Sequence, residues 1–141
     1  MKSIFLKIGL AGAVLLAGVL QAAPITGAVV IANDGALDAS IGAAALKDIY
    51  TGKTTYWRDG QSVTIAVLAD KTDAALKEVS GMDASQFKTF WQRMVFSGRG
   101  QQPKKADDVA ALVALVASTK GAIALVPADA VLKGVKVIEV K

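Results

Sequence analysis

Four short apolar runs, rich in β-branched residues, constrain the fold of this chain more than any other feature. Runs of this length that end at turn-forming residues are typical of strands buried inside a sheet. The second run, Ser62–Leu68, has the clearest strand pattern in the chain. The four predicted strands are Gly27–Ala32, Ser62–Leu68, Gly121–Val126 and Val135–Val140.

Between these strands, apolar residues recur at helical spacing and predict four helices. Their expected bounds are Ile41–Tyr50, Thr72–Val79, Ala84–Phe96 and Asp107 or Asp108 to about Ser118. Residues that can cap a helix precede them, namely Asp38–Ser40 before the first, Asp70 or Thr72 before the second and Asp83 before the third. Gly52 is expected to end the first helix in the left-handed conformation.

The remaining segments are expected to be connections. Ser97–Lys105 is rich in glycine and polar residues and predicts a loop, while Pro127 should end a strand and begin a short helical turn to Ala130. The elements therefore follow the order β α β α α α β β. Apolar strands with intervening helices predict an α/β fold, a three-layer sandwich with a mostly parallel sheet.

The N-terminal segment has the three parts of a secretory signal peptide. Lys2 and Lys7 provide positive charge, the apolar run Ile8–Leu20 follows, and small residues stand at Ala22 and Ala23. The rival interpretation is a membrane anchor. A spanning helix needs about 20 apolar residues, whereas this run has thirteen, so the length favours a cleaved signal.

Cleavage after Ala22 is favoured over cleavage after Ala23. The second site would leave Pro24 directly after the cut, where its fixed φ suits a peptidase poorly. We therefore expect residues 1–22 to be a signal peptide that is removed. Residues 23–141 are expected to form one domain that works in the periplasm or outside the cell and is not embedded in the membrane after cleavage.

Composition narrows the function. The chain has no cysteine and no histidine, which excludes disulfides, thiol chemistry, a lipid-modified cysteine and the commonest zinc ligand sets. The usual general bases and nucleophiles are missing as well, so we expect no enzyme, no cofactor and no metal site. The net charge of +4 includes the two lysines of the signal segment. Without a dense basic patch, nothing indicates nucleic acid as a partner.

Two segments suit an anion. Lys71 and Thr72 precede a predicted helix, whose free N-terminal amides attract negative charge. In Ser97-Gly98-Arg99-Gly100, the glycines allow close backbone approach and Arg99 can bind an oxyanion with two hydrogen bonds. A capped helix and a surface loop explain the same residues without a ligand, and both alternatives stay open. The Gly52–Thr54 sequence follows a helix and is therefore no Walker A loop.

Aromatic side chains recur on one side of the predicted helix Ala84–Phe96. Phe87, Phe90, Trp91 and Met94 fall on that side at helical spacing. We interpret this stripe as core packing rather than as a ligand site, since large apolar side chains at helical spacing usually face a core.

Three segments carry a resemblance to a known family. They are Ala45–Lys53 with Trp57 after it, the strand Val63–Leu68, and Gly121–Val126. The first is similar to an L-x-D-I-Y-x-G-K…W segment and the last to a G-A-I-G-Y-V strand. Together, in this order and spacing, they resemble the phosphate-binding component of bacterial phosphate ABC transporters, a type II periplasmic binding protein.

The resemblance implies one lobe of that fold, the second lobe, standing alone. It also implies a phosphate loop after Val63–Leu68, with an arginine and Ser-Gly-Thr, but Ala69–Leu76 contains neither. Ser97–Gly100 resembles a loop typical of short, exported single-lobe relatives. The expected function is a non-catalytic module that binds phosphate, another oxyanion or a protein partner such as a membrane transporter or receptor. The alternative is a structural or sensory accessory domain that has lost ligand binding.

Overall fold

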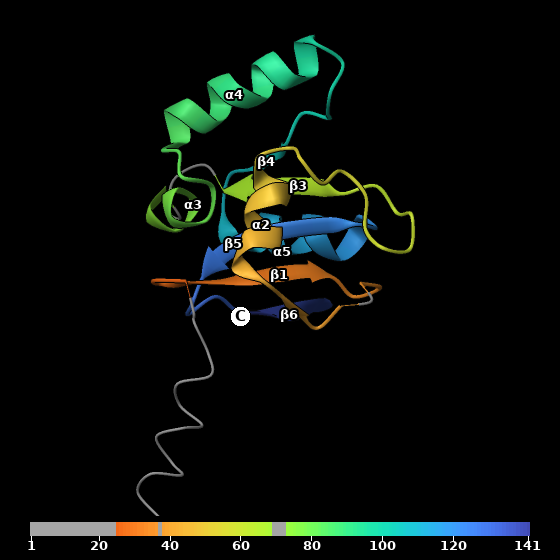
Figure 1. Cartoon of the computed structure of the whole chain (residues 1–141). Helices are drawn as coiled ribbons and strands as arrows, with labels where there is room; N and C mark the ends of the chain where they lie inside the picture. Colours follow the sequence, from red (N-terminus) through yellow and green to blue (C-terminus); the bar gives the residue numbers. More distant parts are fainter. Residues whose placement is uncertain (1–24, 37, 69–72) are drawn as a thin grey trace, which may run out of the picture.

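The computed structural model describes residues 25–36, 38–68 and 73–141 (Figure 1). The predicted signal peptide, residues 1–22, lies outside the described residues, and so do Lys71 and Thr72. Within the described residues, the chain forms one six-stranded sheet and four α-helices. The predicted α/β class is therefore confirmed.

Each predicted strand and helix is present with small shifts at its ends. The strands are β1 (Ala28–Asn33), β2 (Ser40–Ile41), β3 (Thr64–Leu68), β4 (Lys104–Ala106), β5 (Ala122–Pro127) and β6 (Val135–Val140), and the helices are α2 (Ala43–Tyr50), α3 (Asp73–Ser80), α4 (Ala84–Phe96) and α5 (Val109–Ser118). The strand order is β2-β6-β1-β5-β3-β4. Strand β1 runs antiparallel to both of its neighbours, and all other pairs are parallel, so the sheet is mostly parallel as predicted.

The most apolar strands lie at the centre of the sheet. Val30 of β1 lies opposite Leu125 of β5 on one side and Ile138 of β6 on the other. All residues of β5 from Ala122 to Val126 are buried. Such strands are covered on both faces, which explains why they read as unbroken apolar runs in the sequence.

Helices cover both faces of the sheet and give three layers. Successive side chains of a strand point to opposite faces, and accordingly Val30 and Ile31 belong to two different hydrophobic clusters. The cluster with Val30 includes residues of α2, α3 and α4, and the cluster with Ile31 includes residues of α5. In Figure 1, α2 lies in front of the sheet and α5 behind it.

Local capping confirms two helix starts and corrects a third. Asp83 forms a capping box with Gln86 at the start of α4, and Asp108 accepts a hydrogen bond from the amide of Ala111 at the start of α5. The prediction that Asp38–Ser40 caps the first helix is wrong. That helix begins at Ala43 without a side-chain cap, because Ser40 and Ile41 pair with β6 as the short strand β2.

Of two other segments, one differs from the prediction and one agrees with it. The expected loop Ser97–Lys105 ends in strand β4, which pairs in parallel with β3 at the edge of the sheet. Strand β5 ends at Pro127. The carbonyl oxygen of Pro127 accepts a hydrogen bond from the amide of Ala130 at 3.0 Å. The predicted turn from Pro127 to Ala130 is therefore present.

Candidate ligand-binding site

The Trp91 indole organises the region around the predicted Ser97–Gly100 loop. Trp91 is buried on α4, and its Nε1 donates to the carbonyl oxygen of Tyr50 at 3.1 Å. A Cβ at Gly100 would lie 2.7 Å from Cζ3 of Trp91, and one at Gly52 would lie 3.4 Å from its Cη2. The backbone of both glycines thus packs directly on the ring, which gives Gly100 a structural reason to be glycine.

The end of α4 explains the other glycine of this loop. Gly98 has a φ of 75°, in the left-handed region that favours glycine. Its amide donates to the carbonyl of Val95 at 3.0 Å, and the Arg99 amide donates to the carbonyl of Met94 at 2.9 Å. These two bonds form a Schellman cap. Since both amides end the helix, an anion contact from these residues has to come from the Arg99 side chain.

Arg99 lines a surface hollow of about 260 Å³, called here the Arg99 pocket. Its polar side consists of Thr54, Thr55, Tyr56, Ser62 and the segment Gly98–Gln101, and its apolar side consists of Ile49, Val63, Ile65 and Trp91. The segment from Thr54 to Ser62 is folded back by an antiparallel bridge between Tyr56 and Ser62. This bridge and the packing of Gly100 on Trp91 bring two distant parts of the chain to one site.

The pocket offers hydroxyl groups beside a guanidinium. Thr54, Thr55 and Ser62 are half-buried, and Arg99 is exposed. A guanidinium can form two parallel hydrogen bonds to an oxyanion, and hydroxyls can donate one each. Nothing in the sequence pattern marked Thr54, Thr55, Tyr56 and Ser62 as site residues, because hydroxyl side chains are common in ordinary connections.

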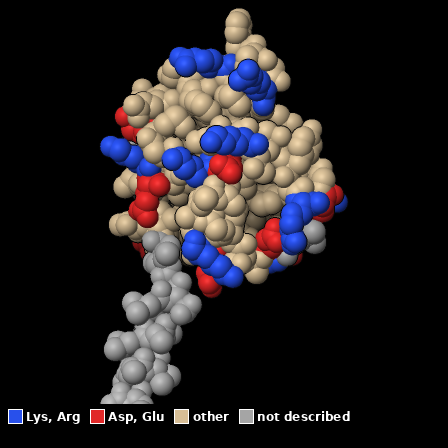
Figure 2. Space-filling model, viewed as in Figure 1, with Lys and Arg blue, Asp and Glu red and all other residues tan. Residues whose placement is uncertain are grey.

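Arg99 has no acidic partner within the described part of the chain. The one ion pair between described residues joins Arg58 to Asp38. Helix α4 adds two further basic residues, Lys88 and Arg93, and contains no acidic residue. Figure 2 shows basic groups at the top of the molecule, toward α4, and mixed charges below. The Arg99 guanidinium, which has no acidic partner in the described ranges, favours an anion at its pocket electrostatically.

The six residues predicted to bind a ligand have different placements. Gly98, Arg99 and Gly100 line the Arg99 pocket, whereas Ser97 does not. The Ser97 hydroxyl donates to the carbonyl of Met94 at 3.1 Å, a bond within its own helix end. Lys71 and Thr72 lie outside the described residues, so their role stays a prediction.

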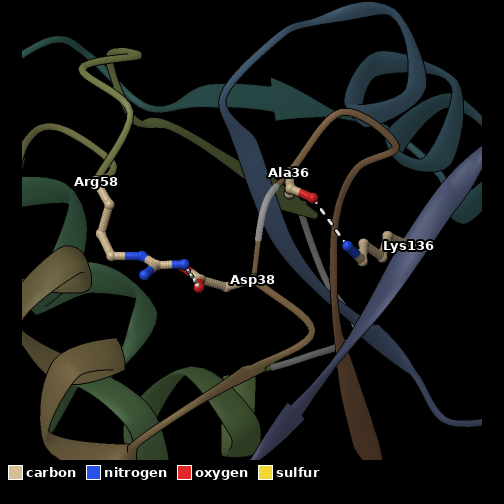
Figure 3. Close-up of polar contacts among 4 residues, drawn as sticks. All are labelled: Ala36, Asp38, Arg58 and Lys136. Carbon is tan, nitrogen blue, oxygen red and sulfur yellow. Dashed lines mark hydrogen bonds and ion pairs between the residues drawn. The ribbon is translucent and has the colours of Figure 1, made fainter.

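A second polar hollow, beside the start of β5 and the end of β1, suits an anion less well. It measures about 260 Å³ and is lined by Asp38 and Asp59 as well as by Arg58 and Lys120. Figure 3 shows the Arg58–Asp38 ion pair and Lys136, whose Nζ donates to the carbonyl of Ala36 at 2.8 Å. The charges of this region are thus balanced or used to hold its own loops.

Two further findings concern the described residues alone. They contain no group of three acidic side chains placed to hold a metal ion. In the same ranges, 25–36, 38–68 and 73–141, no helix has the length and apolar character required to cross a bilayer.

The fold of this chain, with its reversed strand β1 and helices on both faces of the sheet, is consistent with one lobe of a periplasmic-binding-protein fold. Three solved structures share it at TM-scores of 0.63, 0.56 and 0.51. In this order they are a candidate phosphate ABC transporter substrate-binding protein with bound phosphate from Clostridium perfringens, an ABC-type phosphate transport receptor from Vibrio cholerae and a candidate phosphate-binding protein from Planctomyces limnophilus.

The extent of this likeness is limited. Sequence identity is 21%, 17% and 14%, which supports the shared fold alone. The matches cover 81%, 81% and 82% of this chain but 44%, 46% and 41% of the other chains, so this chain spans less than half the length of the proteins it resembles. No protein-family model matches the sequence, and no curated protein sequence matches it significantly.

Proposed function

We propose that this chain is an exported, non-catalytic binding module whose Arg99 pocket takes an oxyanion of the phosphate type. One observation carries the proposal. Arg99 has no ion-pair partner among the described residues and lines one hollow with Thr54, Thr55 and Ser62. A guanidinium and several hydroxyls around one small hollow match the hydrogen-bonding needs of a tetrahedral anion.

Two further lines of evidence support this function. The fold is shared with proteins described as phosphate-binding or phosphate transport components. The absence of histidine and cysteine removes the commonest catalytic groups. The predicted signal peptide, residues 1–22, supports a location in the periplasm or outside the cell, where such a module would meet its ligand.

The expected affinity is low, because the pocket is a surface hollow. Tyr56 on its rim is 62% exposed, and the Arg99 side chain is exposed as well, so a bound anion keeps much of its contact with water. Enclosed sites bury most of a ligand's surface and gain affinity from it. A Kd of about 1 mM, equivalent to about −4 kcal/mol, matches a few hydrogen bonds at such a site.

A protein partner is the second candidate, on the basis of one exposed aromatic residue. Phe96 is 94% exposed at the end of α4, three positions before Arg99. An exposed phenylalanine beside an arginine is a combination found at protein interfaces. A membrane transporter or receptor with an acidic, partly apolar surface would contact both side chains.

A phosphate titration followed by NMR tests the proposed function. At constant ionic strength, phosphate and sulfate should shift the amide signals of Thr55, Ser62 and Gly100 with millimolar affinity, while chloride should not. Shifts spread evenly over basic residues would indicate general ion screening. If no signal moves, the chain is better described as an accessory domain that has lost ligand binding.

A further inference from the structure

A larger cavity lies on the other side of Trp91 and is not part of the Arg99 pocket. It measures about 350 Å³ and lies between α4, the end of β3 and the edge strand β4. Figure 1 shows α4 beside this edge of the sheet, at the top of the molecule. We call it the Tyr50 cavity. Its volume is within the range of about 300–1,000 Å³ that is typical of small-molecule sites.

Three buried aromatic residues are among those that line it. Tyr50, Phe87 and Trp91 all line it, together with aliphatic residues such as Leu68 and Leu125. The Tyr50 and Phe87 rings lie 6.1 Å apart and the Phe87 and Trp91 rings 6.3 Å apart, both in tilted arrangements. Further aromatic rings pack well in such arrangements, so the walls favour a ligand with an aromatic body.

The Tyr50 hydroxyl lacks a hydrogen-bond partner. Among the buried side-chain polar atoms of the described residues, it is the one that makes no hydrogen bond. An unpaired buried hydroxyl is costly and rare in native proteins, and a functional role is one of its explanations. Burial raises the pKa of Tyr50 far above its ordinary value. At neutral pH the hydroxyl is therefore a proton donor in need of an acceptor.

Positive charge marks the same cavity. Lys88 of α4 and Lys105 of β4 line it, and both are exposed at its edge. Among the described lining residues, none is acidic. An anionic group at the cavity edge would therefore interact favourably with two ammonium groups.

We propose that the Tyr50 cavity binds a small aromatic acid that carries a second oxygen. The ring lies among Tyr50, Phe87 and Trp91, the carboxylate lies at Lys88 and Lys105, and the second oxygen accepts the hydrogen bond of the Tyr50 hydroxyl. Such a ligand would pack against the aromatic rings, pair with the two ammonium groups and accept the hydrogen bond of the unpaired hydroxyl.

Access to the hydroxyl requires a small movement of the wall. The Tyr50 oxygen is covered from solvent, so a ligand has to displace the side chains that cover it. Of the thirteen residues of this helix, only Phe87 and Trp91 are buried. The other α4 residues that line the cavity, Ala84, Ser85 and Lys88, are exposed, so their side chains can move without disturbing the core.

The test uses calorimetric titration of the purified protein with 4-hydroxybenzoate and with benzoate, which lacks the second oxygen. The wild type should bind 4-hydroxybenzoate about threefold to tenfold more tightly than benzoate, the effect of one net hydrogen bond. Tyr50→Phe should abolish this difference and remain folded, because it removes only an unpaired hydroxyl. Lys88→Glu should weaken both acids, whereas Lys77→Glu, on exposed α3 surface outside the cavity, should weaken neither.

Three outcomes overturn the proposal. The first is no heat of binding for either acid at millimolar concentration. The second is a preference for 4-hydroxybenzoate that survives Tyr50→Phe. The third is loss of binding in Arg99→Ala with unchanged binding in Lys88→Glu, because the carboxylate would then occupy the Arg99 pocket. Failure of this proposal leaves the phosphate titration of the Arg99 pocket unaffected.

Discussion

Trp91 and Tyr50 are joined by a hydrogen bond of 3.1 Å from the indole Nε1 to the backbone carbonyl oxygen. This bond links the middle of α4 to the last residue of α2. The same indole lines both the Arg99 pocket and the Tyr50 cavity and supports the backbone of Gly100. Trp91 is therefore a structural residue whose position determines the shape of two candidate sites.

Removing Trp91 should destabilise the protein strongly. Trp91 is 3% exposed, and truncation of a buried aromatic side chain to alanine costs about 3–5 kcal/mol. We expect Trp91→Ala to lower the free energy of unfolding by that amount in urea denaturation. Phe96→Ala, on the same helix but 94% exposed, should change it little. A Trp91→Ala protein as stable as the wild type would show that the aromatic stripe is a binding surface instead.

Gly100 should tolerate no side chain. The added Cβ would lie 2.7 Å from the Trp91 ring, and overpacking of this kind costs about 1–3 kcal/mol. Gly100→Ala is therefore expected to lower the melting temperature. Gly42→Ala is the matched control, because its φ is −74° and its Cβ would meet open space. Equal melting temperatures for the two variants would contradict the contact with Trp91.

Tyr50 should make the protein less stable in alkali. Burial raises its pKa, so above pH about 10 the unfolded chain releases the phenolic proton and the folded chain keeps it. The folded state then binds more protons, and stability falls as pH rises, by about 1.4 kcal/mol per pH unit. Tyr50→Phe should lose this part of the decline, and Tyr56→Phe, whose ring is exposed, should keep it. If stability falls with pH identically in Tyr50→Phe and the wild type, the buried Tyr50 hydroxyl is not the cause of the decline.

Export should release a protein that begins at Ala23. The basis is the charged start at Lys2 and Lys7, the short apolar run that follows and Pro24 after the small residues. The intact mass of the exported protein checks this. A full-length species that remains in the membrane fraction would contradict the signal-peptide prediction.

The sequence predicts the main elements because each has a pattern long enough to detect. Asp83 and Gly52 were recognisable as helix boundaries for the same reason, since their roles depend on local chemistry. The strand Ser40–Ile41 is too short for any pattern. Strand β4 contains Lys104 and Lys105, and exposed edge strands often carry lysine. Its sequence therefore resembles that of a polar loop.

The candidate site was only partly predictable. Arg99 stands out between two glycines in the sequence. Thr54, Thr55 and Ser62 do not, because only tertiary packing brings them to the hollow that Arg99 lines. The glycines themselves have structural roles, Gly98 in the helix cap and Gly100 against Trp91. The two glycines therefore have structural explanations, and the expected anion contact depends on the Arg99 side chain alone.

The central claim is that Arg99 binds the oxyanion, and a phosphate titration of its variants tests it most directly. The titration compares amide shifts in the wild type, Arg99→Ala, Arg99→Lys and Arg93→Ala, which removes an exposed arginine of α4 outside the pocket. Both Arg99 variants should fold normally and lose about tenfold or more in affinity. Arg99→Ala removes a charged hydrogen-bonding group, and Arg99→Lys keeps the charge but loses the planar guanidinium that can form two parallel hydrogen bonds. Arg93→Ala should bind phosphate as the wild type does. Unchanged phosphate shifts at Thr55, Ser62 and Gly100 in both Arg99 variants would contradict the claim.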